Sequence, residues 1–183
     1  NLERGRWLPR DTPSTYIRVN IAAFQMRVIE NNAEALTMDI IVGRPYRETP
    51  IFTEDMQYLV FFPYWNVPYS IAVKDKLPLL RQDPAPLAAA GYQARLAGSQ
   101  EFVPVTEVDW QTVRPGQFTL RQLPGDHNAL GKVKFMLPNQ HSVYLHDTPD
   151  KALFRKSERT FSSGCIRLAE PRKLIEWVLN HDK

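Results

Sequence analysis

The sequence of 183 residues contains one cysteine, few glycines and no long apolar run. The single cysteine, Cys165, cannot form a disulfide within the chain, so cysteine usage does not identify the redox compartment. No apolar segment approaches the roughly 20 residues that a membrane-spanning helix needs, and we expect no membrane segment in this sequence. The 23 lysines and arginines are scattered rather than gathered into a stripe, which disfavours nucleic-acid binding.

The residues that are abundant are typical of a strand-rich globular domain. Hydrophobic residues make up 43% of the chain and aromatic residues 11%, which is enough for a packed core. Fifteen prolines against eight glycines favour rigid connections between many short elements over a helical bundle. We therefore expect an α+β, strand-rich fold in a single domain over residues 1–183. The chain begins Asn1-Leu2, with neither an initiator Met nor a signal peptide, and we expect it to be a piece of a longer protein.

Alternation of apolar and polar residues predicts most of the strands. After an extended lead-in over residues 1–15, three strands are expected at residues 16–21, 24–29 and 36–42. Asn31-Asn32 lies between the last two, and because Asn tolerates positive φ we expect a tight hairpin turn there. Further strands are expected at residues 57–62, 101–108, 117–123, 133–137 and 142–146.

The pattern changes between about residues 69 and 113, where helical spacing replaces alternation. One helix is expected over residues 70–81, kinked or ended by Pro78, and a second over residues 84–90. We interpret this region as a subdomain inserted into the strand-rich scaffold, without a second core large enough for an independent domain. An amphipathic helix is expected at residues 171–180, packed on the sheet.

The chemistry-bearing residues gather near the C-terminus. Cys165 follows small residues, and His146 lies nineteen positions upstream at the end of a strand-like run. A thiol and an imidazole are the minimum parts of a cysteine nucleophile with its base. Because Gly164 has no Cβ, a substrate carbonyl could approach the backbone closely, and peptide N–H groups at such a turn stabilise oxyanions. Composition alone also leaves open a buried, unreactive thiol.

Strand periodicity sorts the neighbours of these two residues. Tyr144 and His146 should point to one side of their strand, whereas His141 falls with the core set. The same counting puts Cys165 and Arg167 together, with residues 166 and 168 on the core side. If the two strands are neighbours, thiol, imidazole, phenol and guanidinium converge. A thiol with a free pKa of about 8.5 needs such an imidazole or cation to be mostly thiolate at neutral pH.

Other interpretations of these residues are weaker. One cysteine and dispersed histidines give no pair at zinc-ligand spacing, so we expect no metal site and no cofactor. Ser162 and Ser163 are conceivable nucleophiles, but sulfur beside histidine is the stronger one and the serines are kept as hydrogen-bonding neighbours. His127 is expected to be exposed in a loop. Trp65, in a segment rich in aromatics and proline, could pack in the core or line a groove, with core packing favoured.

Two stretches resemble the catalytic motif of the L,D-transpeptidases, peptidoglycan cross-linking enzymes with the YkuD fold. They are Tyr144-Leu145-His146-Asp147-Thr148-Pro149 and Ser162-Ser163-Gly164-Cys165-Ile166-Arg167. The hairpin at residues 24–42 with Gly43 and Thr49-Pro50 resembles the family's early strands, so the resemblance covers nearly the whole chain. Many members have His at the position of Ser163 and Gly at that of Asp147. Residues 63–68 and the insert that follows resemble the large periplasmic subtype, in which a capping subdomain interrupts the catalytic domain.

The resemblance implies a mixed β-sandwich with residues 69–113 as a lid, and a ping-pong acyl transfer. Cys165 would attack the third-residue carbonyl of a tetrapeptide stem, releasing D-Ala, and a diaminoacid amine on a second stem would complete a 3→3 cross-link. His146 would act as acid and base, oriented by the backbone carbonyl of Asp147, and N–H groups near Gly164 would hold the oxyanion. The substrate-binding residues implied are Tyr144, Ser163, Arg167 and Trp65.

The partners implied are donor and acceptor stem peptides and, as inhibitors, carbapenems. The resemblance also implies a periplasmic or cell-envelope location, and we expect a monomer. Two other functions remain open on the residues alone. A cysteine carboxypeptidase or endopeptidase of wall peptides would use the same dyad with water as acceptor, because the nucleophile does not encode the acceptor. A non-catalytic wall-binding module would keep Cys165 as a buried structural thiol.

Overall fold

A computed structural model describes residues 13–181 of the chain. Most of the extended lead-in expected over residues 1–15 lies outside the described residues. The chain divides into two units, the first formed by residues up to 52 together with those from 152 onward, the second by residues 53–151. Strands outnumber helices in both, and a helix closes the described chain, so the expected strand-rich α+β fold with a C-terminal helix is confirmed.

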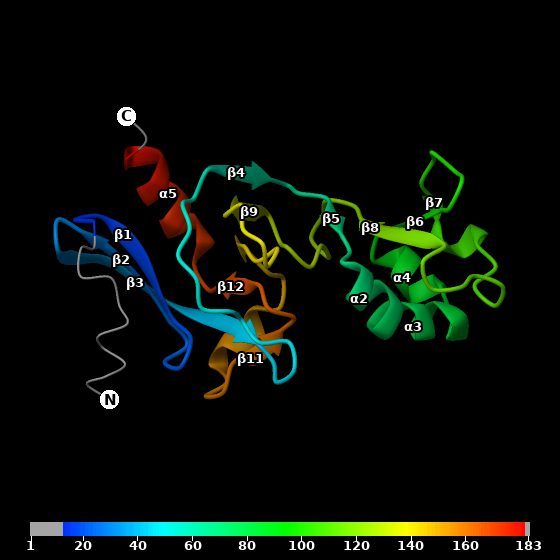
Figure 1. Cartoon of the computed structure of the whole chain (residues 1–183), viewed down its shortest axis with the longest axis horizontal. Helices are drawn as coiled ribbons and strands as arrows, with labels where there is room; N and C mark the ends of the chain where they lie inside the picture. Colours follow the sequence, from blue (N-terminus) through cyan, green and yellow to red (C-terminus); the bar gives the residue numbers. More distant parts are fainter. Residues whose placement is uncertain (1–12, 182–183) are drawn as a thin grey trace. The chain divides into compact units, whose positions relative to one another are not determined.

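The first unit is built on one long strand, β3 (Ala33–Gly43). Antiparallel partners of this strand are β2 (Gln25–Glu30) and β12 (Ile166–Leu168), and β1 (Tyr16–Asn20) pairs with the outer side of β2. β11 (Thr160–Ser162) runs parallel to the end of β3, which makes the sheet mixed. Figure 1 shows β1, β2 and β3 lying side by side in blue. Segments more than a hundred residues apart in sequence thus meet on β3.

The predicted hairpin turn at Asn31-Asn32 is confirmed. Asn31 has φ 50° and Asn32 φ 63°, the left-handed conformations of a two-residue hairpin turn, and Glu30 pairs with Ala33 across it. The strand before the turn starts one residue later than predicted. Phe24, expected as its first residue, has φ 51° and belongs to the preceding turn, in which its N–H donates to the Ile21 carbonyl at 3.2 Å.

The second half of β3 is buried more completely than alternation predicts. Met38 and Ile40 are buried as expected, but Ile41, on the opposite side of the strand, is 0% exposed as well. Ile40 and Ile41 point to opposite faces of the sheet, so both faces are covered at this half of β3, where β12 and β11 flank the strand within the sheet. A strand covered on both faces loses the simple period-2 pattern.

Arg159 fixes the approach to β11. Its Nε donates to the Ile40 carbonyl at 3.2 Å, and its Nη2 donates to the Phe24 carbonyl at 3.2 Å and contacts Asp39 Oδ1 at 2.9 Å. The guanidinium also lies 5.5 Å from the centre of the Phe24 ring, and the side chain is 13% exposed. One side chain therefore joins the segment before β11 to β3 and to the β1–β2 turn.

The C-terminal helix α5 (Pro171–His181) is one residue longer than predicted and starts at the expected proline. Leu174 is fully buried, and the Trp177 indole N–H donates to Glu30 Oε2 on β2 at 3.2 Å. His181 Nε2 lies 2.7 Å from the other Glu30 oxygen. The tryptophan is thus structural, as the sequence indicates, and it ties the helix to β2.

The second unit contains two groups of strands. β9 (Val133–Met136) pairs antiparallel with β4 (Tyr58–Phe61) on one side and with β10 (Leu145–His146) on the other. A separate four-stranded sheet has the order β5-β8-β6-β7. Its strands are β5 (Trp65–Asn66), β6 (Tyr92–Leu96), β7 (Val103–Pro104) and β8 (Phe118–Gln122). The proline-rich segment around β5 forms an edge strand, where missing N–H donors cost least.

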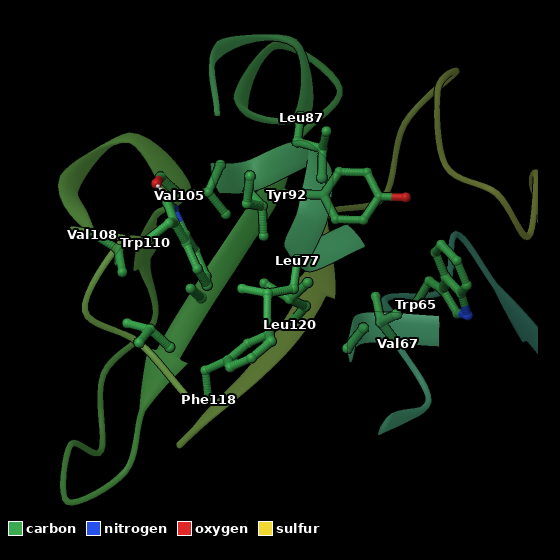
Figure 2. Packing of buried hydrophobic residues seen from close by; sticks show 14 of the residues in the cluster. Trp65, Val67, Leu77, Leu87, Tyr92, Val105, Val108, Trp110, Phe118 and Leu120 are labelled. Atoms are coloured by element: carbon green, nitrogen blue, oxygen red, sulfur yellow. Dashed lines mark hydrogen bonds between the residues drawn. The ribbon is translucent and has the colours of Figure 1, made fainter. Parts of the chain in front are cut away.

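Short helices cover the four-stranded sheet: α2 (Tyr69–Ile71), a π-type turn η1 (Ala72–Lys76), α3 (Leu77–Gln82) and α4 (Ala85–Ala89). Fifteen buried residues between Trp65 and Leu130 form a hydrophobic cluster here, larger than the sequence pattern indicates. Figure 2 shows Trp110 and Phe118 inside it. Their rings meet edge to face at 5.3 Å, and the Trp110 indole N–H donates to the Val105 carbonyl at 2.7 Å.

Three predicted elements of this unit differ from the structure. Pro78 does not end the expected helix, because it lies in the first turn of α3, where its missing N–H is tolerated. The other predicted alternative, a kink, fits the change from η1 to α3 directly before Pro78. The strand expected over residues 101–108 shortens to β7 and the 3₁₀ turn η2 (Val105–Glu107), since Pro104 cannot continue a ladder. The strand expected over residues 142–146 shortens to β10, because the Asn139 side chain bonds to the backbone of residues 141 and 143.

None of the helices in residues 13–181 has the length and apolar character needed to cross a membrane. The insert expected at residues 69–113 falls within the second unit, and its role as a lid stays a prediction.

Replacement of Arg159 by Lys should destabilise the first unit. Lysine keeps the charge but has a single nitrogen, whereas Arg159 reaches its acceptors from both Nε and Nη2, so we expect the free energy of unfolding to fall by about 1–3 kcal/mol. Urea denaturation of the whole chain measures the change. Arg155→Lys is the matched control, because Arg155 is exposed and should change stability by less than about 0.5 kcal/mol. Equal effects of the two substitutions would contradict this role of Arg159.

Candidate active site

Cys165 lies at the entrance to β12, directly after a turn that only glycine adopts without strain. Gly164 has φ 113°, and β12 begins at Ile166. Ile166 and Leu168 are 4% and 0% exposed, whereas Cys165 and Arg167 are partly exposed. The alternation predicted for this strand is therefore confirmed. The thiol lies on the side of the strand away from the buried residues, where a reactive group is accessible.

Ser162 organises the turn from inside. Its hydroxyl donates to the Cys165 carbonyl at 2.5 Å and accepts the Gly164 N–H at 3.1 Å, and the residue is 2% exposed. The serine is thus the hydrogen-bonding neighbour that the sequence predicts. The Gly164 N–H, expected as an oxyanion donor, is used by this hydroxyl in the structure. Its catalytic role stays a prediction that has to account for that contact.

Thr49 connects the same turn to the end of β3. Its buried hydroxyl accepts the Gly43 N–H at 2.9 Å and donates to the Gly164 carbonyl at 2.8 Å. A Cβ on Gly43 would lie 2.6 Å from the Thr49 nitrogen, so glycine is required for the chain to fold back this closely. The loop after β3 therefore supports the turn that carries Cys165.

Arg47, from the same loop, reaches the outer side of the turn. Its Nη1 lies 3.2 Å from the Ser163 hydroxyl, and Ser163 is exposed. Arg47 thereby places a cation next to Ser163. Ser163 is one of the substrate-binding residues that the resemblance implies. Thr49 and Arg47 were not expected in the site. No local signal could have found them, because each lies about 115 positions from its partner.

His146 is the last residue of β10 and is 4% exposed. Its Nδ1 lies 2.5 Å from the carbonyl oxygen of Asp147. A carbonyl oxygen only accepts, so Nδ1 carries a hydrogen, and in the neutral imidazole the lone pair is then on Nε2. This contact is the one expected from the resemblance, and it gives the imidazole the tautomer that a general base needs.

The Asp147 carboxylate is itself a buried, fully engaged group. Its Oδ2 accepts the Lys132 N–H at 2.9 Å, and its Oδ1 lies 2.7 Å from Lys151 Nζ. Burial alone would raise the pKa of Asp147, but the hydrogen bonds from Lys151 and from the N–H groups of Lys132 and Thr148 outweigh it, so its pKa is lowered. The carboxylate is therefore charged throughout the neutral range.

Tyr144 shares a side of its segment with His146, as predicted. The two ring centres are 5.6 Å apart with planes tilted by 59°. Lys134, which pairs with His146 across β9 and β10, has its Nζ 3.8 Å from the centre of the Tyr144 ring. A cation thus stacks on the phenol ring beside the imidazole. Lys134 was not expected in the site, although its place in the alternation of β9 could have indicated it.

The remaining candidates are placed as follows. Trp65 packs in the core, as favoured from the sequence: it is 9% exposed and meets Tyr92 edge to face at 6.2 Å within the hydrophobic cluster. Its contribution to substrate binding stays a prediction. His141 is exposed, so its assignment to the core set is wrong. The strand alternation does not hold at His141, because the Asn139 side chain accepts the N–H groups of residues 141 and 143 and holds this segment in a turn. His127 is exposed in a loop, as expected.

The two members of the predicted dyad lie in different units, Cys165 in the first and His146 in the second. Each has its immediate surroundings fixed within its own unit by the contacts described above. Their pairing stays a prediction. Within residues 13–181, no group of three or more His, Cys, Asp or Glu side chains is arranged to hold a metal ion.

Comparisons with known proteins agree on one family. The family model of the L,D-transpeptidase catalytic domain, YkuD, matches residues 14–183. A protein of Haemophilus influenzae that carries a provisional L,D-transpeptidase name is 32% identical over 164 residues, which is 89% of this chain. The chain spans about a third of that relative's length, 33%.

Solved structures of low identity resemble the chain more distantly. An L,D-transpeptidase from Mycobacterium smegmatis is 14% identical, with a TM-score of 0.48 over 91% of this chain and 54% of that one. L,D-transpeptidase 3 from Mycobacterium tuberculosis is 15% identical, with a TM-score of 0.46 over 86% of this chain and 53% of that one.

Replacement of Thr49 by Val should loosen the turn that carries Cys165. The substitution keeps the shape of the side chain but leaves the Gly43 N–H and the Gly164 carbonyl without their buried partner. We expect a loss of about 1–3 kcal/mol in the free energy of unfolding, measured by urea denaturation. Thr119→Val, at an exposed position of β8, is the control and should be close to neutral. Equal stability of wild type and Thr49→Val would contradict the role of the hydroxyl.

Replacement of Asp147 by Asn should change how stability depends on pH. Because the folded-state pKa of Asp147 is lowered, the carboxylate stabilises the fold above its unfolded-state pKa, and this contribution is lost as pH falls through the folded-state pKa. The stability difference between wild type and Asp147→Asn should be largest near neutral pH and shrink below about pH 4. Denaturation series at several pH values measure it. A difference that stays constant with pH would contradict the assignment.

Proposed function

Because the chain belongs to the family of L,D-transpeptidase catalytic domains, we propose that it transfers acyl groups between peptidoglycan stem peptides through Cys165 and His146. The observation that carries the proposal is the contact of His146 Nδ1 with the Asp147 carbonyl. It leaves Nε2 with the lone pair that takes the proton of a thiol. The partial exposure of Cys165 after a glycine turn supports its role as the nucleophile.

In the first half of the proposed reaction, the Cys165 thiolate attacks the third-residue carbonyl carbon of a tetrapeptide stem. A carbon–sulfur bond forms, and the proton of the thiol is on His146. When the tetrahedral intermediate collapses, the amide bond to D-Ala breaks and His146 gives its proton to the leaving amine. The stem remains on the enzyme as a thioester.

In the second half, the side-chain amine of a diaminoacid on another stem attacks the thioester carbonyl. His146 accepts a proton from the amine, a new amide bond forms, and the carbon–sulfur bond breaks to return the Cys165 thiolate. The product is a 3→3 cross-link, and the proton balance closes because the Cys165 thiolate and protonated His146 of the first step are restored. Water in place of the amine would give a hydrolase with the same residues.

An oxyanion near Cys165 would need donors from the turn. The Gly164 N–H donates to Ser162 Oγ, so an oxyanion has to displace a neutral hydroxyl from it. Hydrogen bonds to charged acceptors are roughly twice as strong as neutral ones, so displacement favours the oxyanion over the uncharged substrate carbonyl. Under this proposal, the contact makes the donor selective for the tetrahedral state, which is the condition for catalysis.

The proposal extends to the substrate and to the setting. Tyr144, Ser163 and Arg167 position the stem carboxylates or the acyl carbonyl, with Trp65 at the groove. The inserted region, residues 69–113, acts as a lid that excludes water and favours transfer over hydrolysis. Carbapenems acylate the Cys165 thiol. We also propose the large periplasmic subtype, and with it a periplasmic or cell-envelope location and a monomer.

Incubation of the chain with disaccharide tetrapeptide, followed by mass analysis, tests the function. We expect cross-linked dimer from the wild type, none from Cys165→Ala, and a rate lower by about 10²–10⁴-fold for His146→Ala, the usual contribution of general acid–base catalysis. His127→Ala is the matched control, because His127 is exposed in a loop, and it should retain the wild-type rate.

The other functions predict different products. Tripeptide without dimer would show that the chain hydrolyses the stem peptide and would contradict transfer. Unchanged substrate from a folded chain, with slow alkylation of Cys165 by iodoacetamide and no carbapenem adduct, would support a non-catalytic wall-binding module and contradict both enzymatic functions.

A further inference from the structure

The proposed reaction uses the carbonyl of Asp147 but gives no role to its carboxylate. That carboxylate is a charge held in a largely buried place, with a side-chain exposure of 12%. Burying a charge costs free energy unless hydrogen bonds or an opposite charge compensate. Here both are present, since the Lys132 N–H lies 2.9 Å from Oδ2 and Lys151 Nζ lies 2.7 Å from Oδ1.

Gly131 completes the place that receives this carboxylate. A Cβ added to Gly131 would lie 2.5 Å from the Asp147 Cγ and 2.6 Å from its Cβ, so no other residue leaves room for it. Gly131 also has φ 62°. Its N–H donates to the Asn128 carbonyl at 2.9 Å, so the residue closes a turn that begins at Asn128.

That turn is anchored in the interior of the second unit. Asn128 is 1% exposed, and its Nδ2 donates to the carbonyls of Pro63 at 3.0 Å and Leu123 at 2.9 Å. Its Oδ1 accepts the Leu130 N–H at 2.8 Å. The glycine that faces Asp147 is therefore fixed by a buried amide rather than carried on a loosely held loop.

The three groups of Asp147 that form hydrogen bonds are each engaged. Its N–H donates to the Val133 carbonyl at 2.9 Å, which extends the pairing of β9 and β10. Its carboxylate is bound by Lys132 and Lys151, and its carbonyl accepts from His146 Nδ1. With the N–H and the carboxylate held, the rotation that would turn the carbonyl away from the imidazole is restricted.

We propose that the Asp147 carboxylate is a positioning residue: held by the Lys132 N–H, Lys151 and the space beside Gly131, it aims the Asp147 carbonyl at His146 Nδ1. It thereby keeps the imidazole in the tautomer with a lone pair on Nε2. The inference rests on the proposed function in one respect, which is that Nε2 acts as the base. Where glycine follows the histidine, no side chain is available to do this.

The tautomer of His146 is measurable without turnover. Long-range ¹H–¹⁵N correlation spectra of the ¹⁵N-labelled chain at about pH 8, above the ordinary imidazole pKa of about 6.5, separate the two neutral tautomers. His146→Ala assigns the signals among the four histidines. We expect the Nδ1–H form in the wild type. In Asp147→Ala, the ratio of Nδ1–H to Nε2–H should fall by about fivefold, the effect of losing about one net hydrogen bond.

Two glycine variants form a matched pair. Gly131→Ala and Gly116→Ala each place a side chain at positive φ, 62° and 89°, but only the Cβ at Gly131 meets the Asp147 carboxylate, because Gly116 has nothing within 4 Å. Gly131→Ala should shift the tautomer ratio in the same direction as Asp147→Ala, whereas Gly116→Ala should leave it unchanged. Lys151→Met should shift the tautomer ratio part of the way toward that of Asp147→Ala, whereas Lys151→Arg should keep the wild-type ratio.

A wild-type tautomer ratio in folded Asp147→Ala would overturn the proposal, and so would an equal shift in Gly116→Ala. If Asp147→Ala does not fold, the Gly131 and Lys151 variants decide by the same criteria. The outcome is separate from that of the proposed function: a tautomer shift in a chain that forms neither dimer nor tripeptide supports this positioning role and contradicts the enzymatic function. If the wild type forms dimer but Asp147→Ala shows no tautomer shift, the enzymatic function is supported and this positioning role is contradicted.

Discussion

The surroundings of Cys165 depend on the two hydrogen bonds of the Thr49 hydroxyl. It receives the Gly43 N–H at the end of β3 and donates to the Gly164 carbonyl in the turn before Cys165. Both partners are buried backbone groups, and a buried polar group without a partner costs about 1–3 kcal/mol. The loop after β3, the glycine turn and the start of β12 are therefore held in one arrangement. Cys165, the proposed nucleophile directly before β12, gains a defined position from a residue 116 positions away.

The surroundings of His146 are fixed by a different device in the other unit. There the backbone carbonyl of the next residue sets the tautomer, and a buried carboxylate with a lysine partner fixes that residue. In both units, a side chain with two or more partners immobilises a backbone group next to Cys165 or His146. Under the proposed function, these backbone groups are already in place before charge develops, which is where preorganised sites gain their effect on rate.

Much of the fold could be predicted from the sequence because its signals are local. Asn31-Asn32 predicts the hairpin because Asn tolerates the positive φ angles that the turn has. The apolar alternation at Ile166 and Leu168 predicts the side of the strand on which Cys165 lies. The prediction was wrong where one residue changes a local pattern, as Asn139 does by bonding to the backbone of residues 141 and 143. Thr49 and Arg47 could not be predicted, because a hydroxyl or guanidinium that acts across 115 positions leaves no periodic signal.

Asp147 illustrates the difference between the residue type and its use. The sequence places a carboxylate after the histidine, where it could be taken for a solvated charge or for a third member of a catalytic triad. The structure turns this carboxylate to the Lys132 N–H and Lys151, and leaves the carbonyl to face the imidazole. A carboxylate at Nδ1 would stabilise the charged imidazolium by a full ionic contact, whereas a carbonyl does so through a dipole. A base held by a carbonyl therefore releases its proton more readily. This suits the proposed dyad, in which His146 would give a proton to one amine and take one from another.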